Sequence, residues 1–124
     1  MLGRVYVILK EQITKTLIKM AVQIATDLDF EQILKDSPRV VVKYYADWCG
    51  ACKMFAPKYK RVSNEEEHAD VVFLEVNAEH NEVARKAGGV DNLPFLASFK
   101  NGVLAEGSAA SKEEYLRKLI ELTK

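Results

Sequence analysis

Two cysteines, Cys49 and Cys52, are the residues of this chain whose type and spacing can do chemistry. They lie where a β-branched and aromatic stretch, expected to be a strand, passes into an expected helix. The first thiol would then sit at a helix N-terminus, where free amide donors and the helix dipole stabilise a thiolate. We predict that Cys49 is the nucleophile of thiol–disulfide exchange. Cys52, one helical turn further in, would resolve the mixed disulfide.

A zinc site and a chance spacing are the other interpretations of this pair. Tetrahedral zinc needs four ligands, and because the chain has no third cysteine, only His68 and His80 could complete the set. Both histidines are separated from the cysteines by expected strand and loop, and we expect them at the surface. The acidic run 65–67 is expected to be solvated. We therefore predict no metal site.

Length and charge limit the remaining possibilities. The chain has 124 residues, which fits a single domain with one sizeable core. Eighteen basic and eighteen acidic side chains cancel, so no overall field favours nucleic acid or an anionic membrane. No apolar run is long enough to cross a bilayer. Two cysteines so close together cannot form a disulfide scaffold that closes long loops. We expect a soluble protein.

The first nineteen residues differ from the rest of the chain. They hold four basic side chains against the single acidic Glu11, with apolar residues between them. The apolar stretch 5–9 is too short for a typical signal-peptide core, and a presequence for organelle import would be richer in serine and lack the acid. Both targeting interpretations stay open. We favour an extension, residues 1–19, upstream of a domain that spans residues 20–124, with Met20 near an alternative start.

From residue 20 onward, strand-like and helix-like stretches alternate. We expect strands at 22–25, 39–45, 71–76, 96–99 and 103–106, and helices at 27–35, 49–66, 81–87 and 111–122. Stretch 39–45 is apolar enough to be a central buried strand. This order predicts an α/β fold with a central mixed β-sheet flanked by helices on both faces.

Local signals refine several of these boundaries. Asp27 is a plausible N-cap of the first helix, because its carboxylate can accept amide protons of the first turn. Ser111 and Glu114 have the spacing of a capping box for the last helix. The dipeptide Asn101-Gly102 predicts a tight β-hairpin. Pro57 inside the long helix removes a backbone donor and predicts a kink there.

From about residue 20 to the C-terminus, the sequence resembles the thioredoxin family. The run 46–54 (Ala-Asp-Trp-Cys-Gly-Ala-Cys-Lys-Met), followed by Ala-Pro at 56–57, matches the active-site signature of the family except at one position. Leu-Pro at 93–94 matches the loop that carries a cis-proline opposite the cysteines. Phe-Lys-Asn-Gly at 99–102 matches the hairpin that follows. The order and spacing of these elements make the resemblance specific.

The resemblance implies roles for individual residues. Trp48 would flank the nucleophile and shape the docking surface, with Gly50 and Ala51 supporting the site. Pro94 would follow a cis peptide bond. The backbone of Leu93 would pair with an extended client segment that carries the disulfide. Among these residues, Ala51 stands where the family usually has proline, which points to a less reducing cysteine pair.

The resemblance also implies an activity and its partners. The chain would be a thioredoxin-fold oxidoreductase that reduces protein disulfides and is recharged by an NADPH-dependent thioredoxin reductase. Its redox-active disulfide would be its only redox group, with no other cofactor. We expect a cytoplasmic monomer acting in electron transport and cell redox homeostasis.

Two further departures from the family concern the surroundings of the cysteines. Lys43 stands six positions before the nucleophile, where the family has a buried acidic residue. An unpaired buried ammonium is costly, so we predict a pair with Glu75 on the neighbouring strand, the alternative being a lysine that reaches the surface. A charged Lys43 would favour thiolate over disulfide and tune the acidity of Cys52. The glycine expected after the hairpin is Gly107 or is replaced by Ser108, so the client-facing loop could differ.

Two other functions remain open at this stage. The first is a disulfide oxidase or isomerase with a less reducing cysteine pair, which Ala51 and Lys43 favour. The second is a thioredoxin-fold interaction module with vestigial cysteines. The intact cysteines, Trp48 and Pro94 argue against the second.

Overall fold

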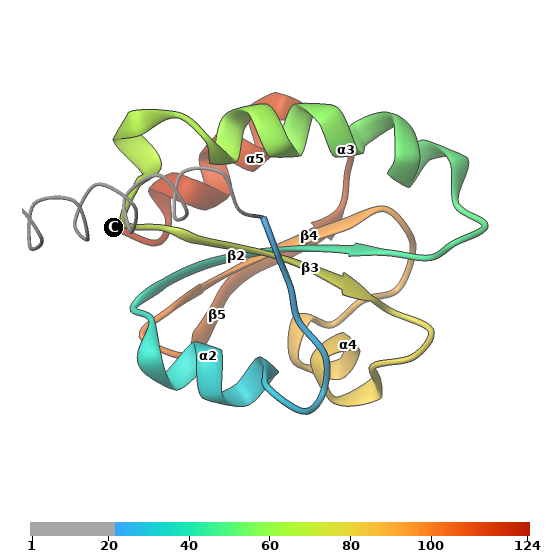
Figure 1. The fold of residues 1–124 in the computed structure, drawn as a ribbon, viewed down its shortest axis with the longest axis horizontal. Coiled ribbons are helices and arrows are strands. Elements are labelled where there is room, and N and C mark those ends of the chain that lie inside the picture. The colour runs from blue at the N-terminus through green and yellow to red at the C-terminus, as the bar shows by residue number, and fades with distance from the viewer. Residues whose placement is uncertain (1–21) are drawn as a thin grey trace, which may run out of the picture.

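The computed structural model describes residues 22–124 and contains one five-stranded sheet between two helical layers (Figure 1). The strand order is β1-β3-β2-β4-β5. The first three of these pair in parallel, whereas β4 runs antiparallel to both β2 and β5. The strands are β1 (Gln23–Ile24), β2 (Arg39–Tyr45), β3 (Val72–Asn77), β4 (Phe95–Lys100) and β5 (Val103–Ala109).

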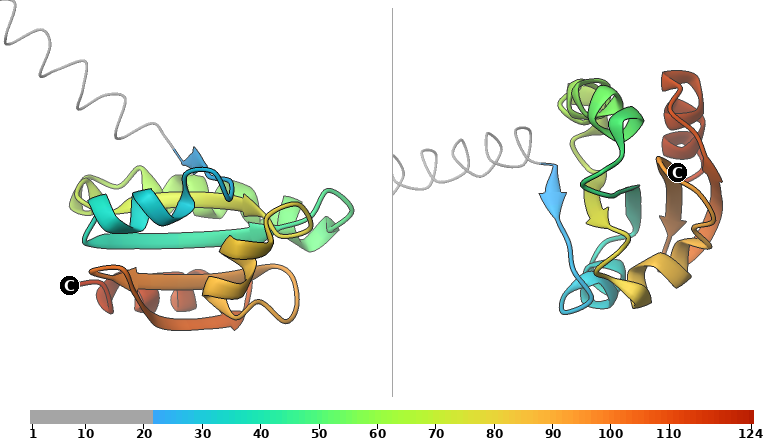
Figure 2. Two further views of the ribbon diagram at one scale, coloured as in Figure 1. Left: turned by 90° about the horizontal axis from the view of Figure 1, so that it is seen from below. Right: turned by 90° about the vertical axis from the view of Figure 1, so that its right-hand side faces the viewer.

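Four helices cover the two faces of this sheet. Helices α3 and α5 lie together on one face, and α2 and α4 lie on the other (Figures 1 and 2). The helices are α2 (Phe30–Asp36), α3 (Gly50–Ser63), α4 (Glu82–Gly88) and α5 (Glu113–Glu121), and a short 3₁₀ helix, η1 (Glu66–His68), follows α3. The expected α/β class with a mixed sheet is confirmed. The boundary expected after residue 19 lies outside the described residues, and no helix within them is long and apolar enough to span a membrane.

Strand β2 is central, as the sequence predicted, and it contributes to two separate cores. Successive side chains of a strand point to opposite faces of the sheet. Val40, Val42 and Tyr44 are fully buried in the core shared with α2 and α4. Val41 is fully buried in the core shared with α3 and α5. By the same alternation, Lys43 projects beneath α3 rather than toward solvent.

Asp27 caps a helix, but not the helix predicted from the sequence. Helix α2 begins only at Phe30. The Asp27 carboxylate instead accepts hydrogen bonds from the backbone amides of Val83 (3.1 Å) and Ala84 (2.9 Å), in the first turn of α4. In return, the side chain of Asn81 accepts from the Asp27 amide at 2.9 Å. The prediction was wrong because α2 begins later than expected, with Asp29 rather than Asp27 at its N-cap position.

The structure confirms one of the two local signals near the C-terminus, the Asn-Gly turn, but not the other, the capping box at Ser111. Asn101 and Gly102 have φ values of +51° and +80°, so the expected tight turn joins β4 to β5. The capping box expected at Ser111 is absent, because α5 begins at Glu113 and its N-cap residue makes no side-chain hydrogen bond. Just before this helix, the amide of Ala110 donates a hydrogen bond to the carbonyl oxygen of Pro94 (3.0 Å), so the chain there is still bonded to the Leu-Pro loop.

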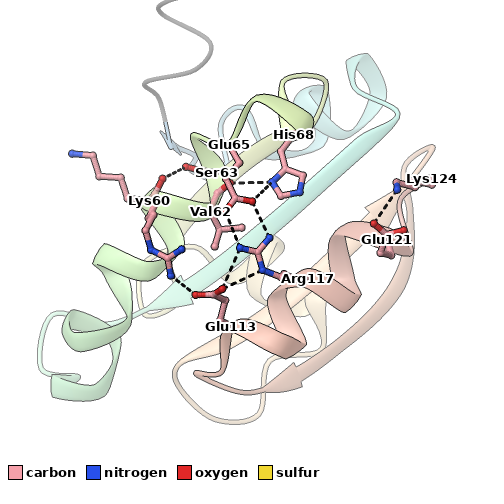
Figure 3. Close-up of polar contacts among 10 residues, drawn as sticks. Lys60, Val62, Ser63, Glu65, His68, Glu113, Arg117, Glu121 and Lys124 are labelled. Carbon is pink, nitrogen blue, oxygen red and sulfur yellow. Dashed lines mark hydrogen bonds and ion pairs between the residues drawn. The ribbon is translucent and has the colours of Figure 1, made fainter.

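The segment after α3 is tied to α5 by an ion-pair network centred on Glu65, which was expected to be solvated (Figure 3). Arg117 donates to both carboxylate oxygens of Glu65 at 2.8 and 2.7 Å, and its Nε donates to Glu113 at 3.2 Å. His68 is only 8% exposed, and its Nδ1 lies 3.0 Å from the carbonyl oxygen of Val62. The expected surface position of His68 and the solvated state of Glu65 are therefore wrong, because α5 packs back over this segment.

We predict that Asp27→Ala destabilises the fold by about 1–2 kcal/mol, the usual cost of losing a helix N-cap. The substitution leaves two amides of α4 without their carboxylate partner. Urea denaturation of both proteins measures the change. Glu31→Ala, which removes a carboxylate from the nearby helix α2, is the matched control and should change stability by less than half as much. Equal effects of the two substitutions would contradict the capping role.

The Glu65–Arg117 pair predicts a specific pH dependence of stability. The guanidinium of Arg117 holds the pKa of Glu65 at about 2, below its ordinary value of 4.5. A carboxyl whose pKa is lowered by folding stabilises the fold above pH 4.5 and loses that contribution as the pH falls toward 2. The stability difference between the wild type and Glu65→Gln should therefore be constant above about pH 5.5 and shrink between pH 4.5 and 2.

Urea denaturation across that pH range measures this difference. Glu121→Gln, at the exposed end of α5, is the control for loss of a carboxylate. A wild-type advantage over Glu65→Gln that stays constant down to pH 2 would show that the pair does not act through the charge of Glu65.

Candidate functional site

Cys49 and Cys52 lie at the strand-to-helix junction that the sequence predicted, and they form a disulfide. Strand β2 ends at Tyr45, and α3 begins at Gly50 with Cys49 as its N-cap residue. The Cys49 Sγ accepts a hydrogen bond from the Cys52 amide at 3.1 Å. The sulfur therefore occupies the place of an N-cap acceptor, where a negative charge is stabilised by free amides and the helix dipole.

The disulfide is nearly closed off from solvent. Cys49 is 5% exposed and Cys52 is 3% exposed, and both pack with Ala46. The intervening residues Gly50 and Ala51 are exposed, and a Cβ placed on Gly50 would meet nothing within 4 Å. The surface over the disulfide at residues 50–51 is thus free of other side chains around Gly50.

Two further elements border the disulfide. Trp48 is 70% exposed, and its indole nitrogen donates a hydrogen bond to the carboxylate of Glu79. Leu93 packs against the cluster that contains both cysteines. The Leu93–Pro94 peptide bond is cis. The structure therefore brings the Leu-Pro loop to the tryptophan and the cysteines, from which it is separated by more than forty residues along the chain.

The expected pair of Lys43 and Glu75 is present beneath the cysteines. The two residues face each other in the β2–β3 register, and Lys43 Nζ lies 3.4 Å from Glu75 Oε2. Lys43 is 4% exposed, and its ammonium lies over the rings of Tyr59 (5.4 Å) and Tyr45 (5.8 Å). Tyr59 is fully buried, and this burial raises the pKa of its hydroxyl, so that ring stays neutral.

A cavity of about 240 Å³ connects this ion pair to the active site. Its walls include Cys52, the Lys43 ammonium and the Glu75 carboxylate. Tyr45 also lines it, and burial together with the nearby carboxylates of Glu75 and Asp47 raises the pKa of the Tyr45 hydroxyl. Asp47 and Lys53 also line it, and both are exposed, so the buried Lys43 and its partner Glu75 are the inner charges of the cavity that contains the second cysteine.

A separate groove of about 290 Å³ opens on the other side, between Trp48 and Leu93. Glu79 and Asp91 line it, and neither residue was singled out in the sequence. Glu79 follows β3 and Asp91 precedes the Leu-Pro loop. Acidic residues in loops are common, so only their convergence in the fold distinguishes these two.

Gly107 is the glycine after the hairpin that the packing requires. It faces Ala97 in the β4–β5 ladder. A Cβ at this position would lie 2.9 Å from the Phe95 ring and 3.1 Å from the carbonyl oxygen of Gly88, both too close. The glycine thus permits the close approach of β5 to the end of α4.

One group of side chains in the described residues has the composition of a metal site. Single ligand atoms of Glu65, Glu67 and His68 lie within 4.8 Å of one another. Both oxygens of Glu65 already accept hydrogen bonds from Arg117. His68 thus gathers with carboxylates on η1, not with the cysteines, as the zinc interpretation would have required.

The sequence profile of the Thioredoxin family matches residues 21–122. The chain is 38% identical over 96 residues to Thioredoxin-T of Drosophila melanogaster, covering 77% of this chain and 60% of that protein. It is 40% identical over 83 residues to Thioredoxin-1 of Saccharomyces cerevisiae, covering 67% and 79%. With the thioredoxin of Geodia cydonium the identity is 34% over 102 residues, covering 80% and 94%.

Solved structures of thioredoxins also resemble this chain. Thioredoxin f from spinach chloroplast, in its long form, superposes with a TM-score of 0.77 at 25% identity, covering 90% of this chain and 93% of that one. A thioredoxin of Plasmodium falciparum gives a TM-score of 0.72 at 28% identity, covering 81% and 97%. These likenesses do not favour the oxidase, isomerase or interaction-module alternatives.

Proposed function

Since this chain belongs to the thioredoxin family and is a thiol–disulfide oxidoreductase, we propose that it reduces the disulfides of client proteins through Cys49 and Cys52. The observation that carries this proposal is the disulfide at the first turn of α3, with the Cys49 sulfur accepting the Cys52 amide. In this position the helix favours the reduced, thiolate form of Cys49.

The reduction proceeds in two exchange steps. The Cys49 thiolate attacks one sulfur of the client disulfide, forming a mixed disulfide and releasing the other client sulfur as a thiolate, which takes up a proton. Cys52 then loses its proton and attacks the Cys49 sulfur, which releases the second client thiol. Two electrons pass to the client, and the Cys49–Cys52 disulfide forms again.

The residues around the disulfide position the client. The exposed Trp48 ring provides an apolar surface beside the nucleophile. Gly50 and Ala51 leave the approach open, and the Leu93 backbone, next to Pro94, pairs with an extended client segment. The contact of Leu93 with the cysteine cluster and the cis Leu93–Pro94 bond support the role proposed for this loop.

The same proposal extends to the cellular setting. An NADPH-dependent thioredoxin reductase would restore the dithiol, and no cofactor beyond the disulfide would be needed. We propose a cytoplasmic monomer that engages clients rather than nucleic acid or membrane. The catalytic domain would span residues 20–124, with residues 1–19 as an extension.

Lys43 and Glu75 are proposed to tune the reduction potential of the cysteines. Both charges border the cavity at Cys52, so their effects on its thiolate oppose each other. The Lys43 side chain is 5% exposed, whereas that of Glu75 is 30% exposed. Solvent screens the carboxylate more strongly, and the field of the ammonium therefore dominates. A net positive field favours thiolates over the disulfide and makes the potential less negative.

We predict that Cys49→Ser abolishes reduction of a protein disulfide, because the remaining cysteine, Cys52, is buried inside the first turn of α3 rather than at its N-cap. Cys52→Ser should react once and stop, since the mixed disulfide cannot be resolved. Mass spectrometry would then show one client covalently bound at Cys49 and released by dithiothreitol. Circular dichroism of both variants controls for folding. Turnover by a folded Cys49→Ser protein would contradict the proposed function.

Lys43→Met should make the reduction potential of the cysteine pair more negative, by on the order of 30 mV for a tenfold change in the exchange equilibrium. Glu75→Gln should move it in the opposite direction, because it leaves the ammonium uncompensated. Equilibration with glutathione buffers measures both values. Lys112→Met, which removes an exposed ammonium next to α5, is the control and should leave the potential unchanged. Shifts of the same sign in the two test variants would rule out the proposed opposition of charges.

A further inference from the structure

The groove between Trp48 and Leu93 lies directly beside the reacting disulfide. Its volume is about 290 Å³, and Val90 adds to the apolar wall that these two residues form. Leu93 is also in contact with the cysteine cluster, so the groove begins where a client would be bound. A client side chain within one or two residues of the reacting cysteine can reach it, since an extended chain advances about 3.3 Å per residue.

The polar lining of this groove has an excess of negative charge. Glu79 and Asp91 contribute two carboxylates, against the single guanidinium of Arg85. Arg85 is partly buried, and its Nη1 donates to the carbonyl oxygen of Ala78 at 3.0 Å. Its charge also acts on Glu82, whose pKa it helps to lower. The guanidinium is therefore already engaged within the protein.

The two carboxylates are placed differently. Glu79 accepts a hydrogen bond from the indole nitrogen of Trp48, so it lies against the tryptophan. Asp91 is exposed, and within residues 22–124 its side chain makes no hydrogen bond or ion pair. The groove thus combines an aromatic and aliphatic wall with a carboxylate that is free to bind a cation.

We propose that this groove binds a lysine or arginine side chain of the client, next to the cysteine that is reduced. This inference rests on the proposed reduction of client disulfides. The long aliphatic part of a basic side chain covers apolar surface while its charged end reaches a polar group. Here the stem lies along Val90 and Leu93, the cation contacts the Trp48 ring, and its charge pairs with Asp91 and Glu79. An acidic side chain would meet like charge, and an apolar one would leave the free carboxylate without a partner.

Four peptides test the preference, each carrying one cysteine as a mixed disulfide with thionitrobenzoate. They differ only in the residues two places before and after the cysteine, which are lysine, arginine, leucine or glutamate. The rate constant for thionitrobenzoate release by the reduced protein is measured at low ionic strength. We expect the lysine and arginine peptides to react about five times faster than the leucine peptide, the size of one exposed ion pair, and the glutamate peptide to react slowest.

Substitutions then locate the preference in the groove. The double variant Glu79→Gln/Asp91→Asn should bring the lysine-to-leucine rate ratio close to one, and Asp91→Lys should make the glutamate peptide the faster one. Glu121→Gln, which removes a carboxylate from the opposite end of the molecule, should keep the wild-type ratio. The proposal is overturned if the double variant keeps that ratio or if the wild type prefers leucine. Failure to reduce any peptide would instead overturn the proposed function itself.

Discussion

The alternation of side chains along β2 is the constraint on which the rest of this structure depends. One face of the strand supplies Val40, Val42 and Tyr44 to the core beneath α2 and α4, and the other supplies Val41 to the core beneath α3 and α5. Both cores are anchored on this strand, so packing on both faces fixes where its C-terminal end lies. That end leads directly to Cys49, and the position of this cysteine at the N-cap of α3 is what lets its sulfur accept the Cys52 amide.

The same alternation explains why a charge lies inside the protein. Lys43 occupies a position on β2 whose side chain must point beneath α3, and it is tolerated there because β3 brings Glu75 opposite it. Moving a charge from water into the protein interior costs free energy unless a partner of opposite charge is close. The pair therefore meets a requirement of the fold and also lines the cavity at Cys52, where we propose that its electric field tunes the redox chemistry.

The disulfide is bordered by two separate spaces, the cavity at Cys52 and the groove beside Trp48, and we propose a different role for each. The cavity beneath Cys52 is lined by Lys43 and Glu75, whose charges we propose to tune how readily the cysteines give up electrons. The groove beside Trp48 is the proposed binding site of a client side chain, which would set a preference among disulfides. Because the two spaces share no lining residue, we expect changes in the reduction potential and changes in client preference to be separable.

Features that depend on neighbouring residues could be predicted from the sequence: the apolar run of β2, the turn at Asn101-Gly102, and the cysteines at a strand-to-helix junction. The Lys43–Glu75 contact was also predictable, because two adjacent parallel strands leave few registers. Two other contacts followed from tertiary packing alone: Asp27 caps a helix whose amides lie 56 and 57 residues away, and Arg117 reaches Glu65. The same packing brought Glu79 and Asp91 into one groove. Such contacts depend on how helices pack against the sheet, and helix packing is set by the whole core rather than by any local pattern.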